Sequence, residues 1–313
     1  MTSGSDSLLQ RIVQRPRRWA VGGVVALLLV GVLVLGAIGW IGADRALHPR
    51  PTQNEPTLAR YPLPVEDITF PSWDGTRLSG WWVPTHRSGA RTIVLLDGYG
   101  GTRAGVLPQA AYLFAAGYNV LLFDFRARGQ SEGRDVTFGA FEQGDALGAL
   151  DYLARRGDVD MRRVGLQGGS MGAAVAIMAA SADARVAGVI AEAPFKDVPS
   201  IIDTEFEKRV GLPVFPFARI TTAILEWRIG VRAADISPIR ALPGLAGRPL
   251  LLIEDADDPE ITPSNQQALY AAAGEPKELW RVPGAGHAKG HTVAPEEYER
   301  RVLAFWESVF KTR

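Results

Sequence analysis

Residues 168–172 read Gly-Gly-Ser-Met-Gly and match the pattern Gly-x-Ser-x-Gly. They follow an apolar strand-like run and open an alanine-rich segment, so we expect Ser170 at a sharp turn from a strand into a helix. Such a turn strains the backbone and exposes the hydroxyl, and the start of the helix favours a developing negative charge. The competing interpretation is a phosphate-binding glycine loop, but no lysine follows these glycines, which excludes a Walker site. The pattern therefore predicts Ser170 as a nucleophile.

A serine nucleophile needs a base that accepts its proton, and histidine is the usual one. The chain has only four histidines: His48, His86, His287 and His291. His287 lies in a Gly-rich loop, 283–287, directly after the last strand-like run, where a loop can deliver a side chain to the edge of a sheet. His48 and His86 lie in linker-like contexts. We predict His287 as the base, with His291 as the fallback.

The base in turn needs a carboxylate that orients its ring and stabilises its cation. Residues 254–259 read Glu-Asp-Ala-Asp-Asp-Pro and follow the seventh strand-like run. They offer four carboxylates between Ser170 and His287, in the chain order serine, acid, histidine. Composition and position alone leave the choice among the four open.

Composition excludes several other chemistries. The chain lacks cysteine, which removes thiol nucleophiles, disulfides, Cys-based zinc sites and iron–sulfur clusters. A three-histidine metal site would use nearly all the histidines, so neither a metal nor another cofactor is expected. The 34 basic residues balance the 34 acidic ones, so no global charge would attract nucleic acid. We expect a small-molecule or peptide substrate and no nucleic-acid partner.

Strand-like and helix-like patterns alternate from Val65 to the carboxyl end, which favours a doubly wound α/β sheet with buried parallel strands. The clearest helical pattern covers Phe138–Arg155, and a closing helix is expected around Val302–Val309. Residues 197–245 break the alternation and read as a small helical lid. The eight strand-like runs are Val65–Phe70, Arg77–Val83, Thr92–Leu96, Asn119–Phe123, Arg163–Gln167, Val186–Ala191, Pro249–Ile253 and Lys277–Val282.

The amino-terminal region divides by composition into three parts. Residues 1–18 form a basic tail, residues 19–41 are uncharged and free of proline, and residues 42–64 are rich in proline. As a helix rising about 1.5 Å per residue, the middle part is long enough to cross a bilayer. A cleaved signal peptide is the alternative, but it has a shorter apolar region and a better cleavage site than 37–43 offers. We predict an uncleaved transmembrane helix, a Pro-rich tether and a folded domain over 65–313.

Basic residues flank the apolar run unequally. Arg11, Arg15, Arg17 and Arg18 precede it, whereas Arg45 and Arg50 follow it. Because the more basic flank usually stays in the cytoplasm, we expect a single-pass membrane protein with its large domain on the extracytoplasmic side.

Several motifs resemble the α/β-hydrolase superfamily, and the likeness runs from about Val65 to Phe310. The segments are SWDGTRLSGWWVP, FDFRARGQSEG, GLQGGSMGAAVA and PGAGHAKG. The chain is most similar to serine aminopeptidase-like and Bem46-like single-domain hydrolases, several of which carry an amino-terminal membrane helix. The resemblance implies an α/β-hydrolase fold with a mostly parallel eight-stranded sheet and a small helical lid, preceded by one transmembrane helix. By the family's pattern after the seventh strand, it also implies Asp258 as the acid, with Asp257 as the runner-up.

The same resemblance implies that the backbone amides of Tyr99 and Met171 bind the oxyanion. The chain departs from the family at Asp97, which stands where a histidine is common and could oppose the negative charge at this position. The leading hypothesis is thus a serine hydrolase that cleaves an ester or an amide through an acyl-enzyme on Ser170, His287 and Asp258. The alternatives are a catalytically weak binding protein with the same fold, or an acyltransferase that uses the same triad.

Overall fold

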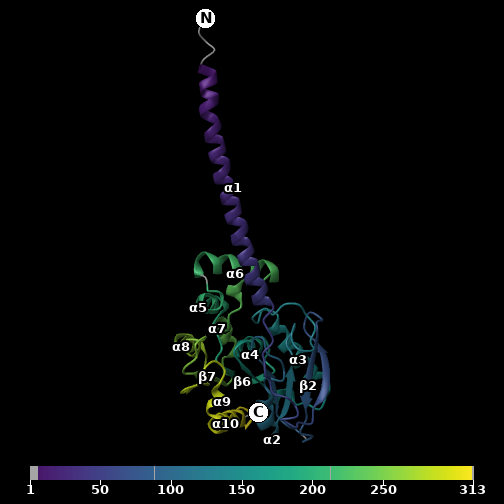
Figure 1. The fold of residues 1–313 in the computed structure, drawn as a ribbon. Coiled ribbons are helices and arrows are strands. Elements are labelled where there is room, and N and C mark those ends of the chain that lie inside the picture. The colour runs from purple at the N-terminus through teal and green to yellow at the C-terminus, as the bar shows by residue number, and fades with distance from the viewer. Residues whose placement is uncertain (1–5, 88, 212, 312–313) are drawn as a thin grey trace.

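The computed structural model describes residues 6–87, 89–211 and 213–311. Figure 1 shows a sheet flanked by helices on both faces, and one long helix that extends away from this body. This helix, α1, covers Asp6–Leu47 and carries the apolar run near its middle.

The sheet has eight strands in the order β1-β2-β4-β3-β5-β6-β7-β8. β2 pairs antiparallel with β1 and β4, and every other pairing is parallel. The predicted eight-stranded, mostly parallel sheet is therefore confirmed. The strands are β1 Glu66–Pro71, β2 Arg77–Val83, β3 Thr92–Leu96, β4 Asn119–Phe123, β5 Val164–Gly169, β6 Val186–Glu192, β7 Leu250–Asp255 and β8 Lys277–Val282.

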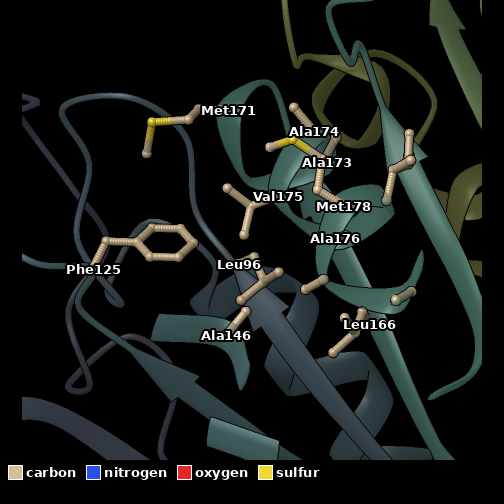
Figure 2. Packing of buried hydrophobic residues seen from close by; sticks show 14 of the residues in the cluster. Leu96, Phe125, Ala146, Leu166, Met171, Ala173, Ala174, Val175, Ala176 and Met178 are labelled. Carbon is tan, nitrogen blue, oxygen red and sulfur yellow. The ribbon is translucent and has the colours of Figure 1, made fainter. Parts of the chain in front are cut away.

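Helices cover both faces of this sheet because its central strands are apolar on both faces. Ile93 and Leu95 of β3 pack with α2 and α10, whereas Val94 and Leu96 pack with α3 and α4. Figure 2 shows the second of these clusters, in which Leu96 of β3 lies near Val175. The flanking helices are α2 Leu107–Ala115, α3 Glu142–Arg156, α4 Met171–Ala182, α8 Pro263–Ala272, α9 Gly290–Val293 and α10 Pro295–Lys311, with a short η1 at Met161–Arg163.

The segment between β6 and β7 is helical, in the region where the sequence predicts a lid. It lies at the end of the body from which α1 emerges (Figure 1). Its elements are α5 Val198–Val210, η2 Val214–Ala218, α6 Arg219–Ile229, η3 Ala233–Asp235, α7 Pro238–Ala241 and η4 Leu242–Leu245. We call residues 197–245 the lid.

The amino-terminal segment differs from its predicted outline at two points. Helix α1 continues to Leu47, so the first residues of the expected tether are helical. Residues 48–64 are irregular but follow the surface of the domain: the Thr52 amide donates to the Gly100 carbonyl over 3.0 Å, and Leu58 and Tyr61 pack on the core beside α2 and α10. The proline-rich segment is therefore attached to the domain rather than free of it.

Candidate active site

Ser170 lies at the turn between β5 and α4, with φ 53° and ψ −120°. This strained conformation is possible because the neighbouring glycines let the backbones approach closely. A Cβ atom on Gly172 would lie 2.2 Å from the Leu96 carbonyl oxygen, and one on Gly168 would lie 2.4 Å from the Gly172 carbonyl carbon. The two glycines thus allow a turn so tight that it presents Ser170 at the carboxyl edge of the sheet.

His287 lies in the loop between β8 and α9 and contacts the two other residues predicted to act with it. Its Nε2 is 2.7 Å from Ser170 Oγ, and its Nδ1 is 2.7 Å from Asp258 Oδ2. Both distances are within normal hydrogen-bond range. The three side chains come from loops after β5, β7 and β8, which end at the same edge of the sheet.

The loop that carries Asp258 also fixes its carboxylate. Oδ1 accepts hydrogen bonds from the amides of Glu260 (2.7 Å) and Ile261 (2.9 Å), and this leaves Oδ2 for His287. The Asp258 side chain is only 2% exposed, whereas its neighbour Asp257 is exposed. The geometry therefore favours Asp258 over the runner-up as the partner of His287.

The fallback base, His291, lies in α9 and lines the same cavity, but its ring bonds elsewhere. Its Nε2 is 3.1 Å from Glu299 Oε1, and its ring packs against Tyr112 and Tyr298. His48 lies just beyond α1 and contacts Asp44 and Asp135. His287 is the histidine that the structure brings to Ser170.

The environment of His287 alters its pKa in two opposing ways. Burial disfavours the imidazolium, but the hydrogen bond and negative charge of Asp258, with further attraction from Glu260 and Asp255, outweigh burial and raise the pKa above its ordinary value of 6.5. A raised pKa makes the unprotonated ring a stronger proton acceptor, and Asp258 stabilises the cation that forms.

The two predicted oxyanion amides belong to residues near Ser170, one next to it in the chain and one from the loop after β3. Met171 is the first residue of α4, so its amide is among those that have no acceptor within the helix. Tyr99 follows Gly98, at which a Cβ atom would lie 3.5 Å from Ser170 Cβ. The Tyr99 hydroxyl donates to the Ala46 carbonyl at the end of α1 over 2.6 Å, and its ring stacks on Phe138. Tyr99 is thus anchored by its side chain, which fixes the loop beside Ser170.

Asp97, the departure from the family pattern, lies in the wall of the cavity. Its Oδ1 accepts from the Gly98 amide over 2.7 Å, and its carboxyl lies against Gly101 and Gly105, where a Cβ would not fit. Burial, with repulsion from Glu55 and Asp124, raises its pKa to about 7 despite the bond from Gly98. This carboxyl is therefore largely neutral in mildly acidic solution and ionises near neutral pH.

A cavity of about 400 Å³ opens beside Ser170 and His287. Its walls include residues 52–56, a contribution that sequence reasoning missed. Glu55 fixes this stretch, because its two carboxylate oxygens accept from the amide (2.7 Å) and the hydroxyl (2.5 Å) of Thr102. Nothing in a proline-rich segment signals such a contact, since it joins residues far apart in the chain.

A second missed feature is a buried acidic pair behind the triad. Glu192, at the end of β6, accepts from the Tyr298 hydroxyl (2.6 Å) and the Gly290 amide (2.9 Å). Asp255 lies nearby at the end of β7; burial and the negative charges of Glu192 and Asp258 raise its pKa to about 8. The signal in the sequence was a carboxylate at the end of each of two otherwise apolar strands. Among the described residues, no three or more His, Asp or Glu side chains are grouped so that they could hold a metal ion.

The fold and the geometry around Ser170 define a hydrolase built on a mostly parallel sheet. A family model described as serine aminopeptidase, S33, matches residues 88–229. An uncharacterized protein of Mycobacterium tuberculosis, Rv2307c, is 30% identical over 296 residues, which cover 93% of this chain and 94% of the relative. The chain belongs to the α/β-hydrolase superfamily.

Two further comparisons bear on the chemistry. The structure of the Pyrococcus furiosus esterase Pf2001 is similar with a TM-score of 0.71 and 27% identity, and the match covers 84% of this chain and 97% of the esterase. The polyketide transferase af380 of Aspergillus fumigatus is 29% identical over 284 residues, which cover 77% of this chain and 97% of that protein. One of these similar proteins is therefore named for hydrolysis and the other for group transfer.

Proposed function

We propose that this protein is a membrane-anchored serine hydrolase that cleaves an ester or amide bond through an acyl-enzyme. The observation that carries the proposal is the continuous chain from Ser170 Oγ to His287 Nε2 and from His287 Nδ1 to Asp258 Oδ2, with 2.7 Å at each step. The likeness to an esterase structure and to the serine aminopeptidase family supports it.

In the proposed reaction, Ser170 Oγ attacks the substrate carbonyl while His287 Nε2 accepts its proton. Asp258 holds the imidazole and stabilises its cation, and the amides of Tyr99 and Met171 donate to the oxyanion. His287 then protonates the leaving alcohol or amine, which leaves the acyl group on Ser170. A water molecule attacks this ester and gives its proton to His287; His287 returns that proton to Ser170 Oγ as the acyl–oxygen bond breaks and the acid leaves. The scheme uses only residues of this chain and a small-molecule or peptide substrate.

The test is fluorophosphonate labelling of the full-length protein in detergent, with the Ser170→Ala variant beside it. The probe phosphonylates a serine that a base activates, so we expect labelling of the parent and none of the variant. Ser200→Ala is a matched control, because that hydroxyl bonds to the Asp197 carbonyl in the lid rather than to a histidine. A folded parent that does not label would favour the catalytically weak binding protein.

Acyl transfer is the second candidate, and the specific observation in its favour is the relative named polyketide transferase. The same acyl-enzyme would then pass its acyl group to an alcohol or amine instead of water. Product analysis with an activated ester, in the presence and absence of an added alcohol, separates the two. A new ester at the expense of free acid supports transfer, whereas free acid alone supports hydrolysis.

We also propose that residues 19–41 cross the membrane as a single span, and that residues 65–313 form the catalytic domain on the extracytoplasmic side. Support comes from the helical segment Trp19–Leu47, whose most apolar stretch has a mean hydropathy of 2.8 and is not buried by the rest of the protein. The greater number of arginines before the span supports the orientation. Residues 1–18 would then be a cytoplasmic basic tail, and residues 42–64 would connect the span to the domain.

A further inference from the structure

Two aromatic side chains of the lid are exposed to an unusual degree. Outside the apolar run, four large apolar side chains are exposed in the part of the chain whose burial is described: Trp73, Phe215, Trp227 and Val293. Phe215 (78%) and Trp227 (74%) are the most exposed of the four. Both belong to the lid, next to the helix that carries the apolar run.

The two aromatics lie on α6 and at the kink just before it. Phe215 is exposed at this kink, where its own backbone is not helical (φ −99°, ψ 133°). Within α6, Arg219, Ala223 and Trp227 are exposed at four-residue spacing. Such spacing places side chains on one side of a helix. The opposite side faces the domain, where Thr221, Leu225 and Ile229 are buried. The face therefore points away from the protein core; we call Phe215, Arg219, Ala223 and Trp227 the outer lid face.

Helix α1 passes directly alongside α6 at the end of its apolar run. A Cβ on Gly39 would lie 2.6 Å from Ile220 Cγ2 and 2.9 Å from Ile224 Cδ1, so the two helices touch closely at this glycine. The rings of Trp40 and Trp227 are 6.3 Å apart. Figure 1 shows α6 lying across the top of the body where α1 leaves it. Trp227 thus lies at the level of the last residues of the apolar run.

The lid is also fixed to α1 by charge. Arg228 bonds to Asp44 over 3.1 Å, and its guanidinium lies 5.2 Å from the centre of the Trp40 ring. Because close packing, a salt bridge and an aromatic contact all join α1 to α6, the position of the lid follows that of the anchor.

We propose that the outer lid face lies in the headgroup region of a phospholipid bilayer and forms a second membrane contact beside α1. Tryptophan is favoured at this depth, because its ring is apolar while its N–H still reaches polar groups. Phenylalanine is common beside it on the apolar side of helices that lie in the interface. Arg219 between them has a long apolar stem and a cation that suits a lipid phosphate. The inference rests on the proposed anchoring, since α1 brings this face to the membrane.

The bilayer is the favoured occupant because the face is continuous with the end of the proposed span. A membrane that surrounds residues 19–41 ends at Trp40, and Trp40 contacts Trp227. A protein partner at the same place would have to lie between the lid and the lipid beside the span. Contact with another protein is therefore the outcome that the experiment must separate from burial in lipid.

The natural absence of cysteine allows a direct test with single-cysteine variants of the full chain. Phe215→Cys, Trp227→Cys, Leu29→Cys and Val293→Cys are each spin-labelled and reconstituted in nanodiscs of phosphatidylcholine and phosphatidylglycerol. Leu29 lies within the apolar run, and Val293 is an exposed apolar residue on α9, far from α1 (Figure 1). Collision rates with oxygen, which concentrates in lipid, and with a water-soluble nickel complex are measured for each label. Their ratio reports depth, because shielding by protein lowers both rates.

We expect the oxygen-to-nickel ratio at positions 215 and 227 to exceed that at position 293 several-fold and to stay below that at position 29. Ratios at 215 and 227 equal to that at 293, with a high ratio at 29, would overturn the inference and leave the anchor intact. Low rates with both quenchers at an unchanged ratio would indicate a protein contact and overturn it as well. A ratio at 29 as low as at 293 would overturn the anchoring itself. Cooperative thermal unfolding like that of the parent shows that each variant is folded.

Discussion

Asp258 makes a different contribution from the other carboxylates near it, because it hydrogen-bonds to the ring of His287. One oxygen is held by two backbone amides, and the other bonds to His287 Nδ1. In Asp258→Asn, an amide NH2 group, which is a donor, can take the place of the acceptor Oδ2. His287 Nδ1 then loses the acceptor that fixes the tautomer of the ring. We expect kcat to fall by about 10⁴-fold, the loss seen when the acid of such a triad becomes an amide. Ester hydrolysis or the rate of fluorophosphonate labelling measures it.

Asp257→Asn is the matched control for this change. It removes the same charge one residue earlier, from a residue that is exposed. The backbone N–H of Asp257 donates to the Ala285 carbonyl, and the substitution leaves that bond in place. The rate of Asp257→Asn should equal that of the parent. A large loss in Asp257→Asn with an active Asp258→Asn would reverse the assignment of the acid.

Asp97 should limit activity on the alkaline side. Its carboxyl shares the cavity with Ser170, and burial raises its pKa to about 7, so it is neutral below that pH and negative above it. A negative charge there opposes the oxyanion, so kcat/KM should fall as the pH rises through about 7 and Asp97 loses its proton. Asp97→Asn should abolish this fall. The pH profile of the two proteins measures this, and an alkaline fall that persists in Asp97→Asn would contradict it.

The same residue should affect stability in a defined pH window. Unfolded, Asp97 loses its proton near pH 3.8, but folded it keeps the proton until about pH 7. The folded state therefore binds more protons in this interval, and its stability falls as pH rises through it. Asp97→Asn should reduce that fall. Chemical denaturation of both proteins at about pH 5 and about pH 8 would measure the difference in their free energies of unfolding.

The sequence predicts individual site residues only as far as local pattern reaches. The turn pattern identifies Ser170, and position after the last strand identifies His287, because backbone conformation and strand ends are local properties. The choice of Asp258 needed the family pattern, since four carboxylates share its loop. Glu55 was not predictable, because its role depends on a contact with Thr102, 47 positions later in the chain.

At the scale of elements, residues 48–64 hold the loop that presents the Tyr99 amide. Glu55 bonds twice to Thr102, and Thr52 bonds to Gly100. In Glu55→Ala the loop loses the two bonds to Thr102, and the amide beside Ser170 is less well placed. We expect kcat to fall about tenfold, equivalent to about 1.4 kcal/mol, with a smaller change in KM. Glu55→Gln keeps an acceptor for the Thr102 amide and should lose less.

Steady-state kinetics on both Glu55 variants measures this effect. An unchanged kcat in Glu55→Ala would mean that the loop is fixed by its other contacts, such as the bond from the Tyr99 hydroxyl to Ala46. Equal losses in the two variants would instead point to the charge of Glu55, which also raises the pKa of Asp97.

The elements themselves were predictable to differing degrees. Four of the strand-like runs match their strands at both ends: Arg77–Val83, Thr92–Leu96, Asn119–Phe123 and Lys277–Val282. Buried strands are short and apolar, and polar or glycine residues end them, so their limits are visible. Helix α1 was harder to delimit, because the end of its apolar run at Ile41 is not the end of its hydrogen bonding at Leu47. Charged residues such as Asp44 and Arg45 end the apolar run, but the helix continues through them.

At the scale of the whole molecule, the lid, the end of α1 and the active-site loop form a connected structure. Arg228 of the lid bonds to Asp44 of α1, and the carbonyl of Ala46, two residues further on, accepts from the Tyr99 hydroxyl. No pattern in the sequence predicts this arrangement, because it joins three distant segments through single contacts. It implies that α1 has a role besides the proposed anchoring, because its last turn supports the residue predicted to bind the oxyanion.

If the proposed span crosses a membrane, the side that carries the domain is a further property of the whole molecule, and the flanking charges predict it. Four arginines precede the span within residues 11–18 and two follow it at 45 and 50. Translocating the more basic flank is disfavoured, so the tail should stay in the cytoplasm and the domain should cross. In spheroplasts, a membrane-impermeant maleimide should label Val293→Cys directly but label Ser3→Cys only after permeabilisation. Labelling of Ser3→Cys alone before permeabilisation would place the domain in the cytoplasm and show that the charge difference is too small to set the orientation.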